Sequence, residues 1–97
     1  MFGRIKLIPF EEMVITDKMP QSIASAWSAI KSSGLVGADY TPLLHCAEQD
    51  VKGVNHWFIC GQTLVTHPPI RRLVKLAVNE FDGKFEIVKE SIEDIFG

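Results

Sequence analysis

The sequence predicts a single α+β domain over residues 1–97, with one helix packed against an antiparallel sheet of four or five strands. Three observations favour this class. A helical apolar stripe occurs in only one stretch, after Pro20. Runs rich in β-branched and aromatic residues follow from Tyr40 onward. Short turn signals join these runs, so we expect consecutive strands to form a meander that wraps around the helix.

Composition limits the classes of function. With 97 residues and 46% hydrophobic content, the chain can bury one modest core. The net charge is −2 and the ten Lys and Arg residues are scattered, which argues against binding to nucleic acid or to a membrane surface. The apolar runs are shorter than the ~20 residues of a membrane span.

The first residues do not look like a targeting segment. Arg4 and Lys6 interrupt the early apolar residues, and Glu11 and Glu12 follow where a cleavage site would need small side chains. We therefore expect neither a signal peptide nor a transmembrane helix, and a cytoplasmic location. A chain already trimmed of its leader would show the same pattern.

The N-terminal part is predicted to hold an extended segment and then helix. Residues 5–10 are expected to be extended, and residues 11–18 to lead into a helix. The main helix follows Pro20, which suits a first turn, and ends before Gly34. Its apolar stripe is formed by Ile23, Ala26, Trp27 and Ile30.

Four strands are predicted after the loop at residues 32–39: residues 40–48, 54–65, 72–78 and 85–90. The prolines of Thr66-His67-Pro68-Pro69 lack backbone donors, so the chain must turn there. Asp82-Gly83 is typical of a two-residue hairpin turn. The tail from Ser91 is expected to form one turn or to fray.

The cysteines and histidines do not form a recognisable catalytic or metal motif. Two cysteines are too few for a disulfide framework, so we interpret Cys46 and Cys60 as small core residues in a reducing compartment. With Gly53 at the centre of a hairpin they would face each other, and a slip of one pair would make them diagonal neighbours.

No enzyme, metal or cofactor is expected. The candidate ligands match no Cys-x-x-Cys or His-x-x-x-His spacing, and neighbouring strand residues point to opposite faces; they are His45, Cys46, His56, Cys60 and His67. The acidic pairs lie in loops, turns or the tail, where solvated charge is the ordinary state, and no glycine-rich phosphate loop occurs.

The stretch Gln49-Asp50-Val51-Lys52-Gly53 falls in the loop between the first two strands after the helix, with Asn55 two residues on. This pattern, Gln-x-Val-x-Gly after a helix and a strand, resembles the first inhibitory hairpin of the cystatin superfamily, in particular its stefin branch. The resemblance implies a cystatin-like fold and reversible, non-covalent inhibition of papain-like cysteine proteases. In that family an N-terminal glycine and two hairpin loops together plug the protease cleft.

Carried over residue by residue, the resemblance implies that Gln49, Val51 and Gly53 bind the protease, with Phe81 and Gly3 as weaker contacts. The chain departs from the family pattern in three ways. Its first tip is more polar, its second hairpin has no Pro-Trp or Leu-Pro tip, and Gly3 lies farther from the helix.

Two alternatives remain open at this stage. The pentapeptide is equally well read as an ordinary β-turn in which Asp50 and Gly53 serve the turn geometry. The chain could also be a non-inhibitory protein-interaction module with the same fold, which pairs as a homodimer through a sheet edge.

Overall fold

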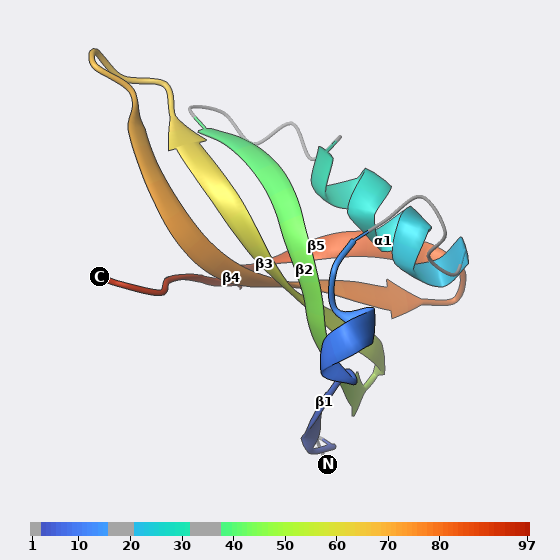
Figure 1. Cartoon of the computed structure of the whole chain (residues 1–97). Helices are drawn as coiled ribbons and strands as arrows, with labels where there is room; N and C mark the ends of the chain where they lie inside the picture. Colours follow the sequence, from blue (N-terminus) through green and yellow to red (C-terminus); the bar gives the residue numbers. More distant parts are fainter. Residues whose placement is uncertain (1–2, 16–20, 32–37) are drawn as a thin grey trace.

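The computed structural model describes residues 3–15, 21–31 and 38–97 and shows a strongly curved sheet with one helix on its concave side (Figure 1). A 3₁₀ turn at Phe10–Glu12 follows the first strand. The remaining elements are β1 (Ile5–Leu7), α1 (Gln21–Lys31), β2 (Ala38–Val51), β3 (Gly53–Leu64), β4 (Ile70–Phe81) and β5 (Lys84–Asp94).

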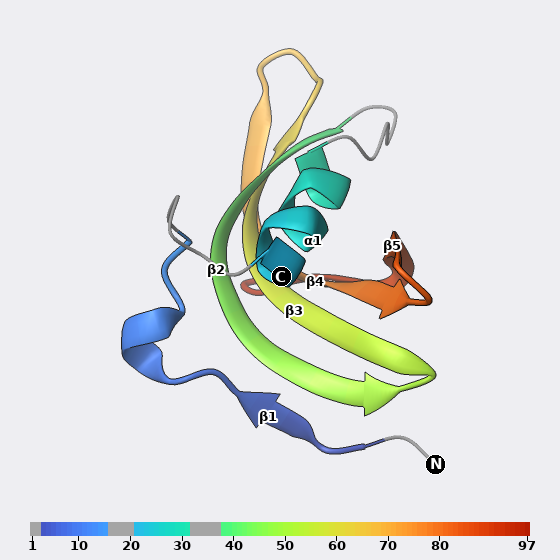
Figure 2. The same ribbon diagram turned by 90° about the vertical axis from the view of Figure 1, so that its right-hand side faces the viewer.

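The sheet is a simple antiparallel meander. Its spatial order is β1-β2-β3-β4-β5, so every strand pairs with its neighbour in sequence. Figure 2 shows how far β2 and β3 bend, with α1 lying inside the bend and β1 running along the outside of β2. The short β1 pairs with β2 at Ile5–Leu7, opposite Ala47–Gln49.

The expected α+β, cystatin-like fold class is wrong. Strands account for 62% of the described residues, whereas the helix is short, with 11 residues. The molecule is predominantly a five-stranded antiparallel sheet. The sequence underestimates the strand content because the predicted strands end too early. In the structure β2 runs on to Val51 and β5 to Asp94.

The extension of β5 also corrects the prediction of a frayed tail from Ser91. The register of β4 and β5 shifts between Lys75 and Ala77. Ser91 lies at this irregularity, where its Oγ accepts a hydrogen bond of 2.8 Å from the backbone N–H of Ala77. This side chain satisfies a backbone donor that the ladder leaves free, and pairing resumes between Lys75 and Glu93.

The core lies between α1 and the concave face of the sheet. The predicted stripe is confirmed for Ile23, Ala26 and Ile30, which are buried, while Trp27 is half-buried. The expected end signals Pro20 and Gly34 lie outside the described residues. Across from the helix, the sheet contributes Phe58, Cys60, Val74, Leu76 and Val78. Within the described residues, no helix has the length and apolar character needed to cross a membrane.

The predicted helix start over residues 11–18 is wrong for the part that the structure describes. Val14 forms an isolated antiparallel bridge with Leu44 of β2. The carbonyl of Met13 accepts a hydrogen bond of 2.8 Å from the backbone N–H of His45. The edge of β2 therefore binds this segment in an extended form, which its sequence periodicity does not reveal.

The predicted hairpin turn at Asp82-Gly83 is confirmed. Phe81 pairs with Lys84 across the turn, and the two central residues have φ angles of 52° and 75°. Positive φ at both positions is the type I′ pattern that suits two-residue hairpins.

Candidate functional site

The first hairpin turn, between β2 and β3, contains a single unpaired residue. Val51 pairs with Gly53, so Lys52 alone connects the two strands. Gly53 has a φ of +87°, and a Cβ at this position would overlap the carbonyl oxygen of Glu80 on β4. Gly53 is thus required by the packing of the chain itself, because only glycine lets the turn approach β4 this closely.

Gly3 lies directly against this turn. Its backbone N–H donates a hydrogen bond of 2.6 Å to the carbonyl of Asp50. The side chain of Gln49 donates from Nε2 to the Gly3 carbonyl at 3.2 Å, and its Oε1 accepts from the Trp57 indole at 3.3 Å. Both ends of the Gln49 amide are therefore used within the chain, where they hold the N-terminal segment on the hairpin.

The β4–β5 turn lies beside the β2–β3 turn. The Nζ atom of Lys52 is 5.3 Å from the centre of the Phe81 ring, a cation–π contact. The Asn79 side chain donates to the Lys52 carbonyl at 3.2 Å and to the Asn55 Oδ1 at 2.9 Å. These contacts fix the position of the first turn relative to β4.

Gly3 and the two turns thus lie at one end of the sheet, which we call the hairpin end and define as Gly3, Gln49–Gly53 and Phe81–Gly83. In Figure 2 the arrowheads of β2 and β4 both lie on the right. Phe81 is 47% exposed, whereas Val51 is half-buried. A shallow hollow of about 400 Å³ lies beside the turns and is lined by Val51, Lys52, Asn55, Asn79, Phe81 and Val88.

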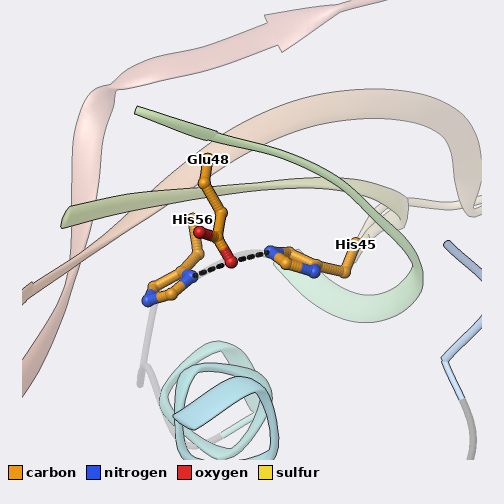
Figure 3. A group of neighbouring side chains, drawn as sticks. All are labelled: His45, Glu48 and His56. Atoms are coloured by element: carbon orange, nitrogen blue, oxygen red, sulfur yellow. Dashed lines mark ion pairs between the residues drawn. The ribbon is translucent and has the colours of Figure 1, made fainter. Parts of the chain in front are cut away.

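A second group of polar side chains lies on the concave face, in the parts of β2 and β3 next to the hairpin end. Glu48 Oε1 is 3.9 Å from His45 Nε2 and 3.9 Å from His56 Nδ1 (Figure 3). His45 and His56 are 5% and 3% exposed. Burial, and then the nearby charge of His56, lowers the pKa of His45 to about 4, so this imidazole is neutral at pH 7.

Sequence spacing did not identify this group. The sequence offers His45 and His56 as candidate ligands, but its spacing does not connect Glu48 with them. The register of β2 on β3 shifts between His45 and Ala47, which leaves Cys46 as an extra residue. This bulge turns His45 and Glu48 toward the same face, although residues three apart in a regular strand point to opposite faces.

Neither cysteine is placed to act as a nucleophile. Both are free thiols, and the register that would have paired them across the hairpin does not occur, since Cys60 faces Pro42. Burial raises the pKa of the Cys60 thiol to about 12 and also raises that of Cys46. Both thiols are therefore protonated at neutral pH, and the thiolate is the reactive form.

Comparison with known proteins finds no match. Among family models, curated proteins and solved structures, none matches this chain.

Proposed function

We propose that this protein is a reversible, non-covalent inhibitor of papain-like cysteine proteases that inserts its hairpin end into the active-site cleft. The observation that carries the proposal is the convergence of three segments far apart in the chain: Gly3 contacts Asp50, and Lys52 contacts Phe81. A projecting edge built from several segments can fill an elongated groove. The proposal includes a cytoplasmic location, which the two free thiols support.

The hairpin end is suited to docking because it is held in place before any partner arrives. A hydrogen bond from Gln49 fixes Gly3, and a hydrogen bond from Asn79 fixes the carbonyl of Lys52. A preorganised surface loses little conformational entropy on binding, so a small contact area can give useful affinity.

We assign the protease contacts to Val51 and Phe81, and a positioning role to Gly3, Gln49 and Gly53. Each apolar side chain contributes about 1.5–3 kcal/mol if docking buries it fully. The charges of Asp50 and Lys52 oppose this gain, because any charge taken into the cleft must be desolvated or paired. The contact of Lys52 with the Phe81 ring leaves its ammonium group beside an aromatic partner during docking.

Gly53 is not a suitable position for testing the proposal. A change at Gly53, such as Gly53→Glu, would disturb the fold, because its φ and its approach to Glu80 exclude a side chain. Val51→Asp is the better choice, since it adds a charge at the contact surface. Val65→Asp is the matched control, because Val65 is 70% exposed in the β3–β4 connection at the opposite end of the sheet.

The full-length chain should be titrated into papain acting on a fluorogenic peptide. We expect saturable inhibition that dilution reverses, an inhibition constant at least tenfold weaker for Val51→Asp, and an unchanged constant for Val65→Asp. Unchanged papain activity at a large molar excess of the protein would refute the proposal, and so would equal losses for the two variants.

The sheet edge favours a second candidate, an interaction module that forms homodimers. β5 is the last strand of the sheet, and among the described residues no strand pairs with its outer side. Its 11 residues offer backbone donors and acceptors to a second copy. Light scattering should then give twice the mass of the chain for the native protein and for Val51→Asp alike. A monomer at all concentrations up to the millimolar range excludes this candidate.

A further inference from the structure

We propose that His45, Glu48 and His56 form a binding site for a divalent transition-metal ion, and that Zn²⁺ is the preferred ion. The three ligand atoms lie within 4.8 Å of one another. The inference is independent of protease inhibition and concerns a different set of residues. It assigns a second binding activity to the concave face, next to the hairpin end.

The strongest evidence is a pair of buried ring nitrogens without partners. His45 Nε2 and His56 Nδ1 make no hydrogen bond, although both residues are more than nine-tenths buried. Both atoms face the same oxygen, Glu48 Oε1, at 3.9 Å, which is too long for a hydrogen bond (Figure 3). A buried polar atom without a partner lowers the stability of the fold. Two such nitrogens that point at one carboxylate indicate a cation bound between the three groups.

Glu80 determines which nitrogen of His56 is available. Its Oε1 is 2.8 Å from His56 Nε2, so in the neutral ring this nitrogen carries the proton and donates it to the carboxylate. The Nδ1 lone pair then points toward Glu48. A carboxylate behind a metal-binding histidine is the usual arrangement in zinc sites, where it orients the ring and makes it more basic.

The donor set matches the chemistry of zinc. Two imidazole nitrogens and one carboxylate oxygen leave a fourth position for water, as in open zinc sites. Ligand atoms about 2.0–2.1 Å from zinc are about 3.3 Å apart in a tetrahedron, so the present separations need only small side-chain rotations to close. The Glu48 side chain is 45% exposed, which gives the ion a route from solvent.

The first experiment uses the full chain after dialysis against a chelator, with Zn²⁺ and Co²⁺ as probes. We expect one equivalent of Zn²⁺ to bind, and Co²⁺ to give the visible absorption bands of a tetrahedral site. In ¹⁵N spectra of the imidazoles, Zn²⁺ should shift His45 Nε2 and His56 Nδ1. His67, which is exposed in the β3–β4 connection, is the internal control and should not shift.

Variants then test the roles of the carboxylates. Glu48→Gln should weaken Zn²⁺ binding at least tenfold, and Glu80→Gln by about 10–100-fold. Glu93→Gln is the matched control, since Glu93 is exposed and pairs with Lys75 on β4; it should leave binding unchanged. The imidazole spectra of the native chain decide the question even if a variant fails to fold. Absence of stoichiometric binding, or shifts of His67 alone, would overturn the proposal.

Discussion

At the scale of single residues, Gly53 shows how strongly the hairpin end depends on close backbone packing. Its positive φ would cost an L-residue about 1–2 kcal/mol. In addition, a Cβ would overlap the Glu80 carbonyl oxygen and lie 3.0 Å from the Phe81 Cβ. Because these neighbours belong to β4 itself, they cannot move aside without disturbing the sheet.

We therefore predict that Gly53→Ala lowers the free energy of unfolding by about 2–5 kcal/mol, the sum of backbone strain and overpacking. Gly83→Ala is the matched control, since Gly83 also has a positive φ, of 75°, but its Cβ would have no atom within 4 Å. It should cost only about 1–2 kcal/mol. Urea unfolding measures both values, and equal losses would show that β4 does not restrict the turn.

A second residue, Cys46, determines which side chains meet on the concave face. As the extra residue in β2, it brings His45 and Glu48 to the same side. The sequence predicted that His45 and Cys46 point to opposite faces of a regular strand, and so it did not connect His45 with Glu48. A bulge of this kind depends on how β2 pairs with β3. A pattern of neighbouring residues in the sequence does not predict that pairing.

At the scale of elements, α1 packs one apolar stripe against the concave face of the sheet. The stripe could be predicted because residues three and four apart lie on one side of a helix whatever the fold around it. The Asp82-Gly83 turn was predictable for a similar reason, since it needs only local backbone geometry. The ends of the strands were not, because polar residues such as Glu93 and Asp94 join β5 through pairing with β4.

We predict that Ile30→Ala lowers the free energy of unfolding by about 2–5 kcal/mol, because Ile30 is 1% exposed and its removal leaves a cavity beneath the helix. The matched control is Ile70→Ala, at the exposed start of β4, which should change the free energy by at most about 0.5 kcal/mol. Urea unfolding again provides the measurement. A small effect at Ile30 would mean that α1 contributes little to the core.

At the scale of the whole molecule, the meander explains why the hairpin end exists. Alternate turns of an antiparallel meander lie at the same end of the sheet, so the β2–β3 and β4–β5 turns are neighbours. Because β1 is antiparallel to β2, its start lies next to the end of β2, which brings Gly3 to Asp50. The turn signals in the sequence predicted the meander from β2 to β5, but not the pairing of β1 with β2 that adds Gly3 to the group.

The proportion of strand to helix was less predictable than the order of the elements. A short motif and a correct element order suggested an α+β class, but the sheet dominates the molecule. The family resemblance implied a protease contact for Gln49; in the structure its amide also binds Gly3 and Trp57 within the chain. Neither outcome could be read from local patterns, because both depend on contacts between segments far apart in the chain.

The most direct test of the account is an NMR map of the ¹⁵N-labelled chain with papain. We predict that the amide resonances that shift or broaden gather at the hairpin end, at Gly3, Val51 and Phe81. The change should disappear when the papain cleft is already filled by a covalently bound peptide inhibitor. No change in the spectrum, or changes confined to β5 or to the β3–β4 connection, would contradict the account.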